Sequence, residues 1–208
     1  PDFAHDSTML VSTSQGVYRS TDGGQRWRQT LNFDVETSHA DLLLFGSDGQ
    51  TTYARSGYAQ NLYKSEDGGQ SWQEQPGEAD FFSVMDGAVN NRGELTIALE
   101  FEARLLQTDL QTAGWREIKG PAELVDITGV VSFSDSTLVI GGSGGLFRSD
   151  DAGQSWQKLG QSSPLAGATV TGLVGQAAFL IATLADGSIF LSPDRGENWQ
   201  DISVFERN

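Results

Sequence analysis

Short runs of apolar residues, each bounded by polar turns that contain glycine, follow one another along the whole chain. The runs at 9–13 and 17–20, with a turn at 14–16 between them, are a clear example. Runs of this length that are rich in β-branched and aromatic residues are typical of β-hairpins. We therefore predict an all-β protein of short antiparallel strands. A helical solenoid is disfavoured, because no 3.6-residue spacing of apolar positions recurs.

The same hairpin pattern returns later in the chain, at 137–149 and again at 179–192. A further strand is expected to begin at the tryptophan that follows each hairpin. One more apolar run precedes each later hairpin, and these runs are 39–45, 81–89, 124–133 and 169–174. Each repeat therefore supplies four antiparallel strands in about forty residues, the size of a repeated β-sheet unit.

An octapeptide that ends in tryptophan follows each hairpin, and it contains all five tryptophans of the chain. The steps between successive tryptophans are 45, 43, 41 and 43 residues, which indicates one unit repeated five times. Four copies keep Ser, Asp, Gly and Trp at the first, third, fifth and eighth positions. These residues are Ser20, Asp22, Gly24, Trp27, Ser65, Asp67, Gly69, Trp72, Ser149, Asp151, Gly153, Trp156, Ser192, Asp194, Gly196 and Trp199. The third copy keeps Thr108 and Trp115 but has Leu110 and Thr112 in place of Asp and Gly.

Four-stranded sheets at this period are the blades of a β-propeller, which bury their faces by stacking on one another. We predict a single five-bladed propeller domain over residues 1–208. The predicted blades are approximately 1–31, 32–76, 77–119, 120–160 and 161–208. The first repeat is short of one strand, which the tail at 202–208 could supply, so that both termini would close the ring. The alternatives are a fragment of a larger propeller and a ring completed by oligomerisation.

The octapeptide has a physical logic as a turn between two strands. Its Asp can accept hydrogen bonds from the N–H groups of its own turn, and glycine tolerates the left-handed backbone that such turns need. We expect the Trp to pack under the turn toward the next blade, so that truncation to Ala costs about 3–5 kcal/mol.

These octapeptides resemble the Asp-box, or BNR repeat, whose pattern is Ser-x-Asp-x-Gly-x-x-Trp. The chain also looks like bacterial BNR-repeat proteins of the photosystem-assembly-factor-like and glycosidase-like groups. The resemblance implies a β-propeller with the boxes on its periphery, and it implies fold rather than activity. It favours an extracellular or periplasmic location, although no signal peptide is recognised in the sequence.

Charge and composition exclude several classes of function. With 13 basic against 28 acidic residues, the net charge is −15, which disfavours binding to nucleic acids and to anionic membranes. No apolar run is long enough to span a membrane. The chain has no cysteine, so disulfides and thiolate metal sites are excluded.

Catalytic chemistry finds little support in the residues. Sialidase chemistry needs an arginine triad, whereas Arg19, Lys64 and Arg148 occupy equivalent places beside boxes and are interpreted as surface charges. Other glycosidases need only two carboxylates about 5–10 Å apart, which an acidic chain offers by chance. We expect no catalysis, and glycoside hydrolysis if the chain is an enzyme.

The binding face of a propeller is formed by the loops that join second to third strands and fourth to first strands, and the candidate binding residues are expected on this face. They are Tyr58, in the loop 56–61, and Glu100, Glu102 and Arg104, in the divergent third repeat. The alternative interpretation of these residues is a solvated strand edge. His5 and His39 are isolated and are expected to face solvent.

No cofactor is expected, although a structural calcium ion in the Asp-Gly turns remains an alternative. The function predicted from the sequence is a non-catalytic scaffold that binds another protein. The alternative is a carbohydrate-binding or glycoside-hydrolase-like protein.

Overall fold

The structure, a computed structural model, describes residues 7–33, 40–46, 49–56, 61–75, 84–99, 103–109, 114–134, 136–161 and 165–203. The described residues form strands and turns and contain no helix. The chain divides into two compact units, Pro1–Phe82 and Ser83–Asn208, and each is described by itself. The single-domain organisation, the blade boundaries and the number of blades in a ring stay predictions.

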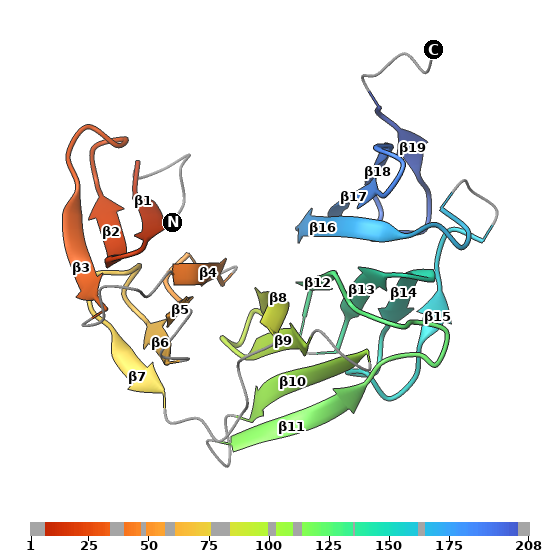
Figure 1. The fold of residues 1–208 in the computed structure, drawn as a ribbon, viewed down its shortest axis with the longest axis horizontal. Coiled ribbons are helices and arrows are strands. Elements are labelled where there is room, and N and C mark those ends of the chain that lie inside the picture. The colour runs from red at the N-terminus through yellow and green to blue at the C-terminus, as the bar shows by residue number, and fades with distance from the viewer. Residues whose placement is uncertain are drawn as a thin grey trace. The chain divides into compact units, whose positions relative to one another are not determined.

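The first unit contains one three-stranded and one four-stranded antiparallel sheet (Figure 1). The strands of the first sheet are β1 (Met9–Thr13), β2 (Gly16–Ser20) and β3 (Arg28–Asn32). Those of the second are β4 (Ala40–Phe45), β5 (Thr52–Ser56), β6 (Leu62–Ser65) and β7 (Gln73–Gln75). The tail at 202–208, predicted as a candidate further strand of the first sheet, lies outside the described residues from 204 onward.

The second unit contains three four-stranded antiparallel sheets, each with its strands in chain order. The first comprises β8 (Val84–Val89), β9 (Leu95–Leu99), β10 (Arg104–Asp109) and β11 (Gly114–Lys119). The second comprises β12 (Gly129–Ser132), β13 (Leu138–Gly142), β14 (Gly145–Ser149) and β15 (Gln157–Lys158). The third comprises β16 (Val170–Gln176), β17 (Phe179–Leu184), β18 (Ile189–Ser192) and β19 (Gln200–Asp201).

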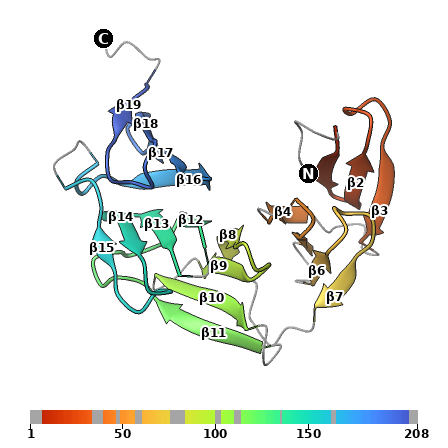
Figure 2. The ribbon, with the colours of Figure 1, turned by 180° about the vertical axis from the view of Figure 1, so that it is seen from behind.

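Within the second unit the β12–β15 sheet packs between the other two sheets (Figures 1 and 2). One face of it joins a core with Leu173, Leu180 and Phe190 of the last sheet. The other face joins a core with Leu105 and Ile118 of the β8–β11 sheet. Alternation of side chains along each strand lets a single sheet bury apolar residues on both faces.

The two sheets of the first unit also share a core, formed by Val17, Leu31, Phe33 and Ala54. Leu10, Tyr63 and Trp72 pack against it while remaining partly exposed. Face-to-face packing of twisted antiparallel sheets is therefore the source of apolar burial in both units.

Candidate functional site

Each complete octapeptide forms a turn centred on a buried serine. Ser20, Ser65, Ser149 and Ser192 are all at most 1% exposed. In every copy the serine Oγ accepts a hydrogen bond from the N–H of the box glycine, at 2.8–2.9 Å. The same Oγ donates to the box aspartate Oδ1 at 2.8 Å. The hydroxyl is satisfied in both directions, which a buried polar group requires.

The box aspartate completes the turn by accepting from the residue four positions later. In Asp67 and Asp151, Oδ1 accepts from the N–H of Ser71 and Ser155, and Oδ2 accepts from their hydroxyls at 2.6 and 2.5 Å. Asp194 has the same pair of bonds to Asn198. The four carboxylates are therefore used to hold their own turns.

These hydrogen bonds stabilise the ionised carboxylate. For Asp151, bonds from the Ser155 hydroxyl and N–H, and from Ser149, lower the pKa to about 2. Burial alone would raise the pKa of Asp67, but bonds from Ser71, Ser65 and Gln70 outweigh it and lower the pKa to about 2. Asp22 and Asp194 also have lowered pKa values, chiefly through the N–H groups of Arg26 and Asn198.

In three of the four complete boxes, at Gly69, Gly153 and Gly196, the glycine lies against an apolar side chain of the preceding sheet. All four box glycines have positive φ. A Cβ at Gly69 would lie 2.7 Å from Leu10, and one at Gly196 would lie 2.5 Å from Leu159. A Cβ at Gly153 would overlap Ile118. Ile118 and Leu159 each stand three residues after a box tryptophan, so one repeat inserts a side chain into the turn of the next.

Trp72 and Trp156 contact the preceding sheet, so the prediction that the box tryptophans pack toward the following blade is wrong for these two residues. The Trp72 Nε1 donates to Thr30 Oγ1 at 3.2 Å, and the Trp156 Nε1 donates to the Lys119 carbonyl at 2.9 Å. In Trp27 and Trp199 the indole N–H instead donates to the carbonyl of the box glycine, at 2.9 Å. The rings are half-buried rather than enclosed, and Trp27 is 41% exposed.

Arg19 and Arg148, which the sequence predicts to be surface charges, both reach the box of the following sheet. Arg19 Nε donates to the Gly68 carbonyl at 2.9 Å. The Arg148 guanidinium lies 2.9 Å from Asp150 and 3.7 Å from Glu197 of the next box, with 18% of its side chain exposed. These arginines therefore join adjacent sheets. Their position one residue before the box serine was the sequence signal for this role.

The divergent third repeat replaces the box with a different polar network. Gln107 is 2% exposed, donates to Thr96 Oγ1 at 2.8 Å and accepts from the Arg116 guanidinium. Thr108 Oγ1 accepts from the Leu95 N–H at 2.9 Å. Trp115 pairs with Thr108 across the β10–β11 hairpin.

A pocket of about 430 Å³ lies at the end of this divergent hairpin. It is lined by Ala103, Arg104, Glu117, Lys119, Gly120, Pro121, Ala122 and Leu124. The Gly120 N–H donates to the Ala103 carbonyl at 2.8 Å, and Ala103 has a φ of 44°. This bond ties the start of β10 to the segment that follows β11. Ala103 and the segment 120–124 therefore line the pocket together.

Charged side chains of the pocket lie on one face of β10–β11. Arg104 pairs with Lys119 in the strand register, and Glu117 is two residues from Lys119. Arg104 Nη1 lies 3.8 Å from Glu117 Oε2, and both side chains are somewhat more than 40% exposed. Leu124, which is 5% exposed, supplies an apolar part of the lining. The pocket thus combines two cations, one carboxylate and a small apolar surface.

Of the predicted binding residues, Arg104 is placed in this pocket. Tyr58, Glu100 and Glu102 lie outside the described residues, as do His5 and His39. Sequence reasoning missed Glu117, Lys119 and the 120–124 segment. The available signal was the predicted binding face itself, which includes the connection from fourth to first strand.

The described part of the chain contains no group of three His, Cys, Asp or Glu side chains placed to hold a metal ion. Over those same residues, no helix is sufficiently long and apolar to cross a bilayer.

Comparison with known proteins agrees with the fold. The family model of the BNR/Asp-box repeat matches residues 147–158, which include the fourth box. No curated protein matches the chain.

Solved β-propeller structures are similar to this chain at low sequence identity. YCF48 bound to a D1 peptide is 15% identical, with 94% of this chain and 78% of that chain covered, at a TM-score of 0.59. YCF48 from Cyanidioschyzon merolae is 15% identical, with 89% of this chain and 65% of that chain covered, at a TM-score of 0.63. The GH74 xyloglucanase from Xanthomonas campestris is 17% identical, with 99% and 37% covered, at a TM-score of 0.68.

The chain carries the BNR/Asp-box repeat, and its four-stranded antiparallel sheets have the β-propeller fold. It spans under two thirds of the Cyanidioschyzon protein and just over one third of the xyloglucanase. At these identities the likeness concerns the fold alone.

Proposed function

We propose that this protein is a non-catalytic binding module that recognises an acidic segment of another protein through the pocket at Arg104 and Lys119. The observation that carries the proposal is the local charge of this pocket. Two cations face one carboxylate there, in a chain whose net charge is −15. An acidic segment would otherwise be repelled by the chain as a whole.

The chemistry of the pocket suits a carboxylate ligand. Glu117 lies 3.8 Å from one end of the Arg104 guanidinium, which has five N–H donors in a fixed fork. Lys119 adds a point charge on the same face of the hairpin. Ala122 and Leu124 could contact apolar side chains that flank the acidic residue. A charge-assisted hydrogen bond contributes about 1.5–3 kcal/mol.

The comparisons support a protein ligand without identifying it. YCF48, which shares the fold, has been solved with a D1 peptide bound. Propellers present connecting loops on a rigid scaffold, an arrangement that suits recognition without a large conformational change.

Glycoside hydrolysis is the competing function, because the xyloglucanase shares the fold over 99% of this chain. A glycosidase needs two carboxylates about 5–10 Å apart. The pocket lining contributes one, Glu117, and it is paired with Arg104. Glu100 or Glu102 would have to provide the second.

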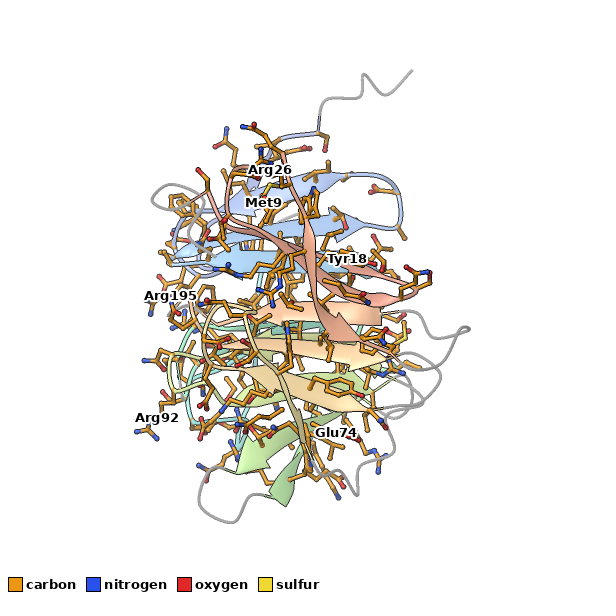
Figure 3. All side chains as sticks on the ribbon, turned by 90° about the vertical axis from the view of Figure 1, so that its left-hand side faces the viewer. Met9, Tyr18, Arg26, Glu74, Arg92 and Arg195 are labelled. Carbon is orange, nitrogen blue, oxygen red and sulfur yellow. The ribbon has the colours of Figure 1, made fainter. Side chains whose placement is uncertain are left out.

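Selection from a phage-displayed random peptide library tests the proposal. We expect the protein to enrich peptides with Asp or Glu, and Arg104→Gln or Lys119→Gln to weaken binding of an enriched peptide by about 10- to 100-fold. Arg92→Gln is the matched control, since Arg92 is an exposed cation of the β8–β9 turn (Figure 3) and should leave affinity unchanged.

Enrichment without acidic residues, or equal affinity in all three variants, would contradict the proposal. A panel of aryl glycosides separates it from the enzyme alternative. Robust turnover that is abolished by Glu100→Gln or Glu102→Gln would replace the binding function with hydrolysis.

A further inference from the structure

Strand β11 differs from the outermost strands of the other sheets in its length. It is the edge strand of the β8–β11 sheet (Figure 1), has six residues and pairs with β10 along its whole length without a register shift. The edge strands β7, β15 and β19 have three, two and two residues. Strand β3 has five, but its pairing with β2 shifts between Val17 and Tyr18. Short and bulged edges protect a sheet from pairing with other chains, and β11 has neither protection.

Alternate residues of β11 turn their main-chain groups away from β10. The Gly120 N–H donates to the Ala103 carbonyl at 2.8 Å, so this pair is a hydrogen-bonded one. Hydrogen-bonded and non-bonded pairs alternate along an antiparallel ladder, and Ile118 is therefore bonded to β10 as well. Glu117 and Lys119 occupy the positions between, where the N–H and C=O groups point toward the outer edge of the sheet.

Most of these outward groups are open to a ligand. The Lys119 carbonyl accepts a hydrogen bond from Trp156 Nε1 of the next repeat, which agrees with its outward direction. Within the described part of the chain, no hydrogen bond engages the N–H or C=O of Glu117 or the N–H of Lys119. Arg116, Glu117 and Lys119 are exposed residues. Unused main-chain groups along an exposed edge form a template to which an extended chain can add as a further strand.

The charges along this edge select among extended chains. Glu117 and Lys119 are two residues apart, so their side chains lie on the same face of the strand. Residues directly opposite each other on neighbouring strands interact, and opposite charges stabilise such pairs whereas like charges destabilise them. The residue opposite Lys119 should therefore be acidic, and the residue opposite Glu117 should be basic. Arg104, which pairs with Lys119 in the strand register, adds a second cation for the acidic residue.

We propose that the acidic segment recognised by this protein binds as an additional antiparallel strand on the outer edge of β11. Its acidic residue lies beside Lys119 and Arg104, and a basic residue two positions later lies beside Glu117. This inference rests on the proposed function and adds the conformation, direction and sequence pattern of the ligand. Main-chain hydrogen bonds supply affinity, and the charged pairs supply selectivity. A second copy of the chain is a poorer occupant, because two chains of net charge −15 repel each other.

A scan of N-methylated peptides tests the strand addition on the unaltered protein. The probe is an acidic peptide enriched from the phage-displayed library, synthesised with one amide methylated at a time. In an added strand every second amide donates to β11 and the others point away from it. We expect methylation to weaken binding at least about tenfold at alternate positions and to have little effect between them. Equal losses at neighbouring amides would overturn the proposal.

Two variants of Glu117 test the same bonds from the side of the protein. Both Glu117→Pro and Glu117→Ala remove the carboxylate, but only proline also removes the outward N–H. Proline is tolerated on an edge strand where its N–H would not join the ladder, so both variants should keep the β10–β11 pairing. We expect the proline variant to bind the peptide at least about tenfold more weakly than the alanine variant. Equal affinities overturn the proposal once circular dichroism shows that both variants are folded.

Hydrogen exchange identifies what covers the edge. The amides of Glu117 and Lys119 should exchange rapidly in the free protein and slowly in the peptide complex. Protection in the free protein overturns the proposal, because the chain itself would then cover the edge, or a second copy would if the protection depends on concentration. Acidic peptides that need Arg104 but show no alternation overturn the strand addition and leave the proposed function standing. A library without acidic enrichment overturns the proposed function, and this inference with it.

Discussion

Leu10 of β1 lies against Gly69 of the following sheet, so closely that a Cβ on the glycine would be 2.7 Å from the leucine Cδ1. The arginine beside it in the register, Arg19, donates to the carbonyl of Gly68 in the same turn. A box turn is therefore a contact point between sheets as well as the link between two strands. This relationship leads to the predictions on glycine and tryptophan below.

Replacing Gly69 with Ala should destabilise the first unit more than replacing Gly23. Both residues have positive φ, at 80° and 70°, and share the backbone strain of a left-handed alanine. Only Gly69 also meets Leu10, which adds about 1–3 kcal/mol of overpacking. A Cβ at Gly23 has open space around it. Urea denaturation followed by tryptophan fluorescence measures the difference, and equal losses would show that the Leu10 contact is unimportant.

Trp156→Phe should lose the hydrogen bond to the Lys119 carbonyl and cost about 0.5–1.5 kcal/mol. Trp156→Ala should cost about 2–4 kcal/mol, less than a core tryptophan, because the ring is only half-buried. Trp27→Ala is the comparison, since its indole N–H bonds within its own box and its side chain is 41% exposed. If Trp27→Ala lost as much stability as Trp156→Ala, the contact of Trp156 with the preceding sheet would not be what stabilises the fold at this position. Thermal unfolding by circular dichroism compares the three variants.

Acid should weaken the box turns over a defined range of pH. The pKa values of Asp67 and Asp151 are lowered from 3.8 to about 2. The folded state therefore favours the carboxylates, and this stability is fully present above about pH 4 and lost as the pH falls toward 2. The double variant Asp67→Asn, Asp151→Asn should show a flatter fall in stability between these values. Denaturant midpoints measured at several pH values test this, and an unchanged slope would exclude the box carboxylates as its source.

The contribution of Asp86 to stability should depend on pH in the opposite direction to that of the box aspartates. Burial raises the pKa of this β8 carboxyl, although Val130 N–H of β12 donates to its Oδ2 at 2.8 Å. The folded state therefore favours the protonated form, and its contribution to stability falls as the pH rises through the folded pKa.

Asp86→Asn keeps an acceptor for the Val130 N–H and removes the buried charge, so we expect equal or greater stability at neutral pH. Asp86→Ala leaves that N–H without this acceptor and should cost about 1–3 kcal/mol. Hydrogen exchange at the Val130 amide reports the bond directly. Faster exchange in the Asn variant than in the Ala variant would contradict this account.

The repeat made much of the fold predictable, because each octapeptide is a local structure. The serine, aspartate and glycine of a box bond within six residues of one another, so sequence spacing alone carries their geometry. The four-stranded antiparallel sheets could be predicted because a hairpin pattern precedes each octapeptide and a further strand follows it. The direction in which Trp72 and Trp156 pack was wrong in the sequence analysis, because it depends on the twist and stacking of whole sheets.

The candidate site was only partly predictable. Arg104 was found because the third repeat departs from the others at that point. Lys119 was missed, since a lysine at the end of a strand has no distinctive pattern until the β10–β11 register places it opposite Arg104. Arg19 and Arg148 were misjudged for a related reason, because their partners are residues of the adjoining repeat.

Ile118 and Leu159 pack against the glycine of the next box, and this contact bears on how repeats can be exchanged during evolution. In the second unit, the contact between neighbouring sheets uses two positions, a box glycine in one repeat and an aliphatic residue three places after the tryptophan of the previous one. A repeat that keeps both can be duplicated, exchanged or replaced as a cassette while its loops vary freely. Gene duplication can therefore add a repeat while the contacts between neighbouring sheets stay the same.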